Sequence, residues 1–211
     1  MKMKRVFHMT ILLVGVVAFF VSCSDKHDDT VANLKVAIIG EINTYATYMA
    51  FAEKAEKDGY RNIANMFRAA AAAENIHARN HNDVLKKMGE PEFIRPTAKT
   101  LTVNGTAENI QAALDGETHE FTVTYPGFIA TAKKEKCDDA VRSFSLANLA
   151  EENHESQFSK ALEEGNENVP SKWFVCTQCG GLFDEPFTKC RLCKTDSERQ
   201  YFIPMEFVAK R

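Results

Sequence analysis

The chain has 211 residues, of which 45% are hydrophobic and 26% are charged. This composition is typical of a globular protein with enough apolar side chains for a core, and the length allows one or two domains. The formal net charge is −3. Because phosphate contacts require a basic surface, this charge argues against a nucleic-acid partner.

Residues 1–22 have the parts of an export signal. Three basic residues come first, an almost wholly apolar run follows, and Ser22 precedes Cys23 and a polar segment. The apolar run is shorter than the roughly 20 residues that span a bilayer. This pattern looks like a bacterial lipoprotein signal, with an ordinary secretory signal or an uncleaved anchor as alternatives. We predict signal removal, lipidation of Cys23, a tether over 23–30, and an exported protein anchored on the periplasmic side of the inner or outer membrane.

Two long helices are predicted next. The first covers about 31–59 and is rich in helix-forming residues up to Asp58-Gly59, which is a typical helix stop. The second covers about 60–88 and ends at Gly89. Residues 89–105 contain two prolines and show little helical pattern, so they predict a long connection across a helix bundle.

A third helix is predicted from about Thr106 and a fourth from about Asp138 to Gly165. Pro126 would ordinarily break the third helix, so a split and a kinked continuation both remain open. Four helices with one long crossover are the ferritin-like arrangement. The predicted fold is therefore an all-α ferritin-like four-helix bundle over 31–165.

A small C-terminal domain is predicted over 166–211. Its composition changes to cysteines, aromatic residues and turns from Trp173 onward. A domain of about 40 residues cannot build a sufficient core, so it needs a metal or disulfides. Two Cys-x-x-Cys pairs supply the metal alternative, because each pair makes a tight turn that aims two thiolates at one point. The predicted ligands are Cys176, Cys179, Cys190 and Cys193. Iron and zinc share this tetrahedral geometry, and Cys137 is left as a free thiol.

The second and fourth predicted helices carry the same Glu-x-x-His motif, at 74–77 and 151–154. Three residues advance a helix by about one turn, so the two side chains of a motif leave the same face. The first and third helices add carboxylates. The resulting set of candidate metal ligands is Glu41, Glu74, His77, Glu117, Glu120, Glu151 and His154.

These side chains predict a pair of metal ions inside the bundle. A buried carboxylate without a partner costs several kcal/mol or becomes protonated, so the set needs cations. Carboxylates with one imidazole per metal suit iron or manganese. A single Glu-x-x-His motif usually belongs to a polar surface, whereas two motifs with acids on the other helices indicate a di-metal site.

Several other side chains lie near the predicted site in the sequence. Tyr45, Tyr48 and Tyr125 are candidate core aromatics, and Tyr48 shares a helix face with Glu41, where it could hydrogen-bond a carboxylate. His81 lies one turn after His77 and is expected to contact a neighbour of the metal ligands or the surface. His119 and Glu152 lack the ligand pattern.

Together these residues resemble the rubrerythrin family over about 31–207. The likeness rests on Gly40-Glu41 with Tyr48, on 73–77, on 116–120 with Tyr125-Pro126, on 150–155 and on 173–193. The family keeps Tyr-Pro within a continuing third helix, which favours the kinked continuation. The resemblance implies an iron in the cysteine site and a di-iron site.

The resemblance also implies roles for the ligands. Glu74 and Glu151 would bridge the irons, with Glu41 and Glu117 as terminal ligands and His154 on one iron. The other iron would exchange between Glu120 in the oxidised state and His77 in the reduced state. Glu120, Tyr48 and Tyr125 are the residues expected to act in catalysis.

The reaction that the resemblance implies is the reduction of hydrogen peroxide to water, with electrons relayed through the cysteine iron from an unknown donor. A head-to-tail homodimer, with one chain's cysteine domain against its partner's bundle, is also expected. Two alternatives are kept. One is an iron-oxidising or iron-handling protein with a structural zinc knuckle, and the other is a structural lipoprotein with zinc in both sites.

Overall fold

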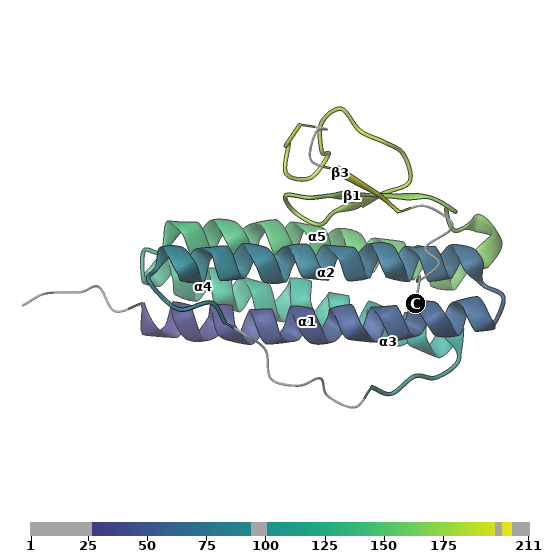
Figure 1. Ribbon diagram of the computed structural model, residues 1–211, viewed down its shortest axis with the longest axis horizontal. Coiled ribbons are helices and arrows are strands. Elements are labelled where there is room, and N and C mark those ends of the chain that lie inside the picture. The colour runs from purple at the N-terminus through teal and green to yellow at the C-terminus, as the bar shows by residue number, and fades with distance from the viewer. Residues whose placement is uncertain (1–26, 94–100, 197–199, 204–211) are drawn as a thin grey trace, which may run out of the picture.

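The computed structural model describes residues 27–93, 101–196 and 200–203. The expected signal segment and Cys23 lie outside the described residues, as does part of the predicted crossover. Figure 1 shows a long helical bundle with a small sheet resting on one side of it. This arrangement confirms the predicted ferritin-like bundle, followed in the chain by a small cysteine-containing unit.

The first two helices form an antiparallel pair. Helix α1 runs over Asp28–Lys57 and helix α2 over Arg61–Lys87. Gly59 has a φ of +89° and turns the chain between them. Helix α1 begins three residues before the predicted start, where Asp28 and Asp29 suit the positive end of the helix dipole.

The third helical segment of the bundle changes from α-helical to π-helical and back again. Helix α3 covers Thr106–His119, a π-helical turn (η1) covers Glu120–Thr124, and α4 covers Tyr125–Lys134. Pro126 lies in the first turn of α4, and the wider π turn before it lets the segment continue past a residue that lacks an N–H donor. The structure therefore confirms the kinked continuation.

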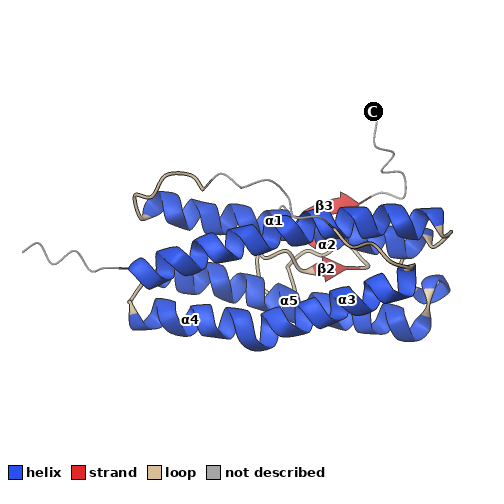
Figure 2. Ribbon diagram, turned by 90° about the horizontal axis from the view of Figure 1, so that it is seen from below, coloured by secondary structure: helices blue, strands red, loops and turns tan. Residues whose placement is uncertain are grey.

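Helix α5, Asp138–Glu164, completes the bundle and is followed by a 3₁₀ turn (η2) at Asn166–Asn168. Helix α1 packs along α2, while α3 and α4 pack along α5 (Figure 2). Two apolar clusters fill the interior. One includes the packed rings of Tyr48, Phe51, Phe67 and Phe158, and the other is centred on Phe144 and Leu85.

A three-stranded antiparallel sheet follows the bundle. Its strands are β1 (Trp173–Cys176), β2 (Leu182–Phe183) and β3 (Gln200–Ile203), in the order β2-β1-β3. Phe174 pairs with Phe183 on one side and with Phe202 on the other. The sheet lies over α2 and α5 (Figure 1). Trp173, Val175 and Leu182 join the apolar cluster of the bundle, which holds the sheet there.

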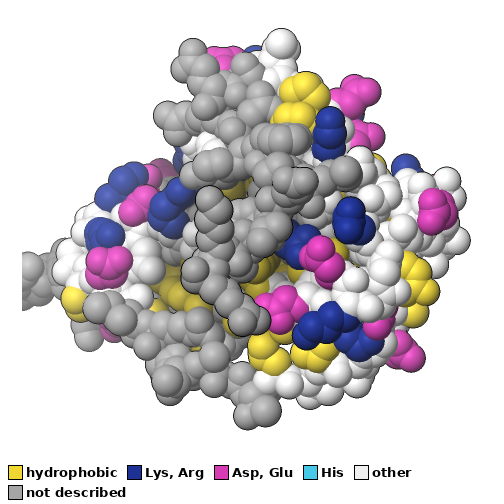
Figure 3. Space-filling model, turned by 45° about the vertical axis from the view of Figure 1, so that its right-hand side comes forward, with side chains coloured by type: hydrophobic (Ala, Val, Ile, Leu, Met, Phe, Trp, Pro, Cys, Tyr) yellow, Lys and Arg dark blue, Asp and Glu magenta, His cyan; other side chains and the backbone are white. Residues whose placement is uncertain are grey.

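On the face drawn in Figure 3, Lys and Arg side chains lie among Asp and Glu side chains, so neither charge dominates that face. Among the described residues, no helix is both long and apolar enough to cross a membrane.

Candidate metal centres

Six of the seven predicted carboxylate and histidine ligands converge inside the bundle. Helix α1 contributes Glu41, α3 contributes Glu117, and α2 and α5 each contribute a Glu-x-x-His pair. All six side chains are at most 2% exposed. They form two groups in which the possible ligand atoms lie within 4.8 Å of one another. The first group contains Glu41 and His77, the second contains Glu117 and His154, and the two groups share Glu74 and Glu151.

The shared glutamates lie between the two histidines. His77 Nδ1 is 2.9 Å from Glu151 Oε1 and 3.1 Å from Glu74 Oε2. His154 Nδ1 is 2.9 Å from the other oxygen of Glu151 and 3.6 Å from the other oxygen of Glu74. Each shared carboxylate therefore presents one oxygen to each side. This arrangement suits two cations bridged by Glu74 and Glu151.

Several polar atoms of this cluster lack a hydrogen-bond partner among the described residues. Glu41 Oε2, Glu74 Oε1, Glu117 Oε2 and both oxygens of Glu151 are buried without a well-formed hydrogen bond, and so is His154 Nδ1. Buried polar atoms almost always have partners, and an unpaired buried carboxylate is costly. The donor set therefore fits a pair of bound metal ions, which would supply the missing partners.

The ionisable groups of the cluster shift one another's pKa values. Burial raises the pKa of Glu41 and of Glu117 to about 8. Burial opposes the charge of Glu151 as well, but the nearby His77 and His154 outweigh it and lower the pKa of this carboxyl. The pKa of His154 is raised because its contacts with Glu117 and Glu151 outweigh the cost of burial.

Two buried tyrosines hold the outer carboxylates of the cluster. Tyr48 donates a hydrogen bond of 2.5 Å to Glu117 Oε1, and Tyr125 donates a short one to Glu41 Oε1. Each bond leaves the second oxygen of its carboxylate directed at the cluster. The predicted contact between Tyr48 and a carboxylate is thus observed, although its partner is Glu117 and not the Glu41 of its own helix. Tyr45 is 39% exposed and takes no part.

Glu120 lies apart from both groups of ligands. It is the first residue of the π turn, is only half-buried, and lines a pocket of about 140 Å³ between α1 and α3 together with Tyr48 and Gly116. Burial and the charge of Glu151 raise its pKa. In this structure His77, and not Glu120, completes the group around Glu41.

His81, near the cluster, has hydrogen-bond partners that the sequence did not reveal. His81 is fully buried and hydrogen-bonds Ser143 and Tyr125. The signal for this position was its spacing, because a residue four after His77 lies on the same helix face. His119 and Glu152 are exposed, in line with their lack of the ligand pattern.

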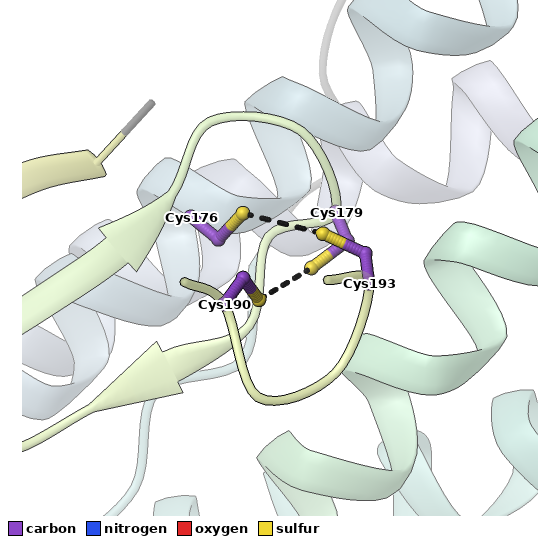
Figure 4. A group of neighbouring side chains, drawn as sticks. All are labelled: Cys176, Cys179, Cys190 and Cys193. Carbon is purple, nitrogen blue, oxygen red and sulfur yellow. Dashed lines mark hydrogen bonds between the residues drawn. The ribbon is translucent and has the colours of Figure 1, made fainter. Parts of the chain in front are cut away.

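The four predicted cysteine ligands meet at the end of the small sheet. Figure 4 shows their sulfur atoms pointing toward one another. The Sγ atoms of Cys176 and Cys193 are 3.7 Å apart, and those of Cys179 and Cys190 are 3.8 Å apart. A tetrahedron with metal–sulfur bonds of about 2.3 Å has edges of roughly 3.8 Å. The cysteines, which we call the knuckle, thus fit one tetrahedral metal ion. Cys137 is a free thiol directly before α5, beside Met88, and is not part of the knuckle.

The knuckle contacts both histidines of the bundle. His77 Nε2 hydrogen-bonds the carbonyl oxygen of Cys179 at 2.8 Å, and His154 Nε2 hydrogen-bonds that of Gly180 at 3.1 Å. Because a carbonyl can only accept, each Nε2 carries the hydrogen. In a neutral ring each Nδ1 then keeps a lone pair that is directed at the carboxylates, as a metal-binding histidine requires.

These contacts lie within a single chain. The expected head-to-tail pairing with a partner's bundle stays a prediction, because the structure holds one chain. Within that chain the short linker after α5 is tied back along α2, with Asn65 Nδ2 donating to Ser171 O and Asn80 Nδ2 donating to Gln178 O. Asn153 of α5 also accepts the backbone N–H of Leu182.

The fold and these two centres define a ferritin-like carboxylate di-metal protein with a rubredoxin-like cysteine site. The Rubrerythrin family model matches residues 32–162, which is more than half of the chain. The chain belongs to the rubrerythrin family. As a member it is a di-iron, oxidative-stress protein of the oxidoreductase class, in a family that binds a di-iron site and an iron in a rubredoxin-like site.

Relatives are similar over most of the chain. Nigerythrin of Nitratidesulfovibrio vulgaris is 36% identical over 165 residues, covering 78% of this chain and 81% of that protein. Rubrerythrin-2 of Clostridium acetobutylicum is 32% identical over 180 residues, covering 83% and 97%. The solved structure of fully reduced, all-ferrous nigerythrin matches with a TM-score of 0.77 and 34% identity, covering 82% of this chain and 86% of that one.

The contact between knuckle and bundle can be tested at Gly180. Its φ is +84°, and a Cβ there would lie 2.3 Å from His77 Nε2. Gly59 has a similar φ of +89° but open space around it. We expect Gly180→Ala to lower the free energy of unfolding by about 1–3 kcal/mol more than Gly59→Ala, because overpacking adds to the shared backbone strain. Urea denaturation measures the difference, and equal losses would contradict the close contact.

The buried carboxylates predict a pH dependence in protein whose carboxylate site has been emptied with a chelator. A carboxyl with a raised folded pKa stabilises the fold below its unfolded pKa, and this contribution is lost as the pH rises through the folded value. For Glu41 and Glu117 the window runs from 4.5 to about 8. We expect the free energy of unfolding to fall over this window by on the order of a few kcal/mol.

Urea denaturation across this pH range measures the effect. The raised pKa of His77 and His154 has the same sign, whereas the lowered pKa of Glu151 acts below the window. The double substitution Glu41→Gln with Glu117→Gln should flatten the slope. Stability that is constant or rises with pH in the unsubstituted protein would contradict the raised values.

Proposed function

We propose that this protein is a peroxidase that reduces hydrogen peroxide to water in the bundle, with electrons supplied through the knuckle. The observation that carries the proposal is the direct contact between the two centres. Cys179 is at once a knuckle ligand and the acceptor of the hydrogen bond from His77. A short covalent and hydrogen-bonded path therefore leads from the knuckle to the carboxylate site.

Each centre supplies one part of the reaction. Iron in the knuckle would carry single electrons, and a pair of irons in the bundle would hold the two electrons that one peroxide consumes. The bundle residues bind the pair. We assign Glu74 and Glu151 as bridging ligands, Glu41 and Glu117 as terminal ligands, and His154 to one iron. For the other iron we assign His77 in the reduced state and Glu120 in the oxidised state.

Glu120 is the residue that favours peroxide as the substrate. It lies at the wall of the pocket between α1 and α3, beside Tyr48, so a small polar molecule entering there meets a carboxyl and a hydroxyl before it reaches the buried ligands. The π turn that carries Glu120 replaces regular α-helical hydrogen bonding at this position, and such turns often occur at functional sites. Glu120 and Tyr48 would orient the substrate, and Tyr125 would hold Glu41.

We also propose that the protein works outside the cytoplasm. The support is the sequence of residues 1–22 and Cys23, which predicts an exported lipoprotein attached to a membrane. The electron donor must then be an extracytoplasmic reductant. A homodimer remains a proposal by analogy with the family, and electron transfer within one chain does not require it.

Metal analysis with redox cycling tests the proposed reaction. We expect about three irons per chain, one in the knuckle and two in the bundle. The sulfur-to-iron absorption should bleach on reduction with dithionite and recover rapidly when peroxide is added. Protein with zinc in the knuckle and iron in the bundle is the matched control, since zinc cannot carry an electron. Slow peroxide consumption with faster iron oxidation and iron release would instead support an iron-handling protein.

Substitution of Glu120 tests the assigned exchange of ligands. We expect Glu120→Ala to slow peroxide turnover by about tenfold or more, in the range typical of residues that act directly in catalysis, while two irons remain in the bundle. The control is Glu152→Ala, which removes an exposed glutamate from α5. Steady-state turnover and iron content are the measurements. Unchanged turnover in Glu120→Ala would contradict a role for this carboxylate.

A further inference from the structure

A line of hydrogen bonds joins the carboxylate cluster to a second opening of the bundle. Ser143 Oγ of α5 lies 2.8 Å from His81 Nδ1 of α2. His81 Nε2 lies 3.1 Å from the hydroxyl of Tyr125, the first residue of α4. Tyr125 in turn donates to Glu41 Oε1. Three elements thus contribute one residue each to a continuous path that ends at a metal ligand of α1.

The outer end of this path reaches the surface. Ser143 lines a pocket of about 190 Å³ that is open to solvent at the junction of α2, α5 and the knuckle. The other lining residues are Asn80, Asp83, Val84, Lys87, Asp139, Arg142, Leu146 and Gln178. Several of these are exposed and charged, so the pocket that Ser143 lines is open to solvent and polar. This opening is separate from the pocket between α1 and α3 that Glu120 lines.

All hydrogen bonds along the path are donated in the same direction. The hydroxyl hydrogen of Tyr125 is used on Glu41, so the Tyr125 oxygen accepts from His81 Nε2–H. His81 Nδ1 then has a lone pair and accepts from the hydroxyl of Ser143. Every hydrogen on the path therefore points from the pocket toward the cluster, which is the orientation needed to deliver protons inward.

His81 has the properties of a neutral proton carrier. Its ring is fully buried against the rings of Tyr125 and Phe144, and burial lowers its pKa to about 3. A neutral imidazole has one donor and one acceptor nitrogen, so it can take a proton on one side while releasing one on the other.

The proposed reaction creates the demand for such a path. Reduction of one hydrogen peroxide to two waters breaks the O–O bond and consumes two electrons and two protons. The six converged ligands are at most 2% exposed, so they have almost no direct contact with bulk water as a source of protons. We propose that Ser143, His81 and Tyr125 form a proton path from the pocket between α2 and α5 to Glu41. This inference rests on the peroxidase function proposed above.

One passage along the proton path moves each hydrogen by one step. A protonated water in the pocket gives its extra proton to Ser143, and so becomes neutral water, as the Ser143 hydrogen moves to His81 Nδ1. The hydrogen of His81 Nε2 moves to Tyr125, and that of Tyr125 moves to Glu41, which passes it to a substrate oxygen. No residue of the path holds a net charge afterwards. Rotation of the hydroxyls and return of His81 to its first tautomer restore the path.

Single-turnover kinetics test the proton path. Fully reduced iron-loaded protein is mixed with hydrogen peroxide, and the oxidation of the bundle irons is followed in H₂O and in D₂O. We expect His81→Gln and Tyr125→Phe each to slow this step by about tenfold or more and to increase its solvent isotope effect. Glutamine can keep both hydrogen bonds but does not relay protons as imidazole does. The exposed His119→Gln is the matched control and should behave like the unsubstituted protein.

A second measurement does not depend on activity. In zinc-loaded protein at neutral pH, ¹⁵N spectra of the histidine rings should show His81 as neutral with its hydrogen on Nε2. Tyr125→Phe should shift this Nε2 signal. A charged ring, or a hydrogen on Nδ1, would overturn the proton path whatever the kinetics show. Iron content and the absorption of the oxidised iron pair should be unchanged in the variants.

The kinetic outcomes separate the two proposals. If the unsubstituted protein reacts with peroxide and His81→Gln reacts equally fast with the same isotope effect, the proton path is wrong and the peroxidase function stands. If variants that keep their iron lose only stability, His81 is merely structural, which also overturns the path. If the reduced unsubstituted protein does not react with peroxide, the proposed function fails, and the proton path fails with it.

Discussion

Burial of ionisable groups in the middle of the bundle is the constraint on which the rest of the structure depends. Four glutamates and two histidines are almost inaccessible to water, and several of their inward atoms lack a well-formed hydrogen bond. Such a cluster destabilises the fold unless cations are bound or carboxyls are protonated. The alanine-rich α2, the ring cluster around Phe67 and the tyrosines that hold Glu41 and Glu117 all serve to keep these groups in place.

The two histidines connect this constraint to the C-terminal unit. Each ring turns Nδ1 to the carboxylates and Nε2 to a knuckle carbonyl, so the position of the knuckle and the tautomer of both rings are fixed together. The absence of a side chain at Gly180 allows this approach, because a Cβ would collide with His77. A unit too small to fold on its own core is thereby placed within hydrogen-bond distance of the buried site.

Much of the site could be predicted because its geometry follows from local periodicity. Two Glu-x-x-His motifs and two Cys-x-x-Cys pairs fix their own side chains within one turn, and the structure brings both sets together. Three features depend on long-range packing that no local pattern records. They are the π turn that sets Glu120 apart, the partners of His81 on α4 and α5, and the docking of the knuckle on its own bundle. Pro126 gave a local sign of the irregular turn, but not of its type.

The place of His77 links ligand exchange to the knuckle. In the proposed exchange, Glu120 replaces His77 on one iron, so His77 must withdraw from the carboxylates or Glu120 must turn inward from its pocket. The His77 ring is held at both ends, by Glu74 and Glu151 on one side and by Cys179 on the other. Glu120 is only half-buried and lies on an irregular turn. Because the glutamate has the weaker restraints, its motion costs less, and the docked knuckle favours the state in which His77 is the ligand. That state is the reduced one in our assignment, so the contact that supplies electrons also stabilises the form that holds them, which in the proposed reaction is the form that meets peroxide.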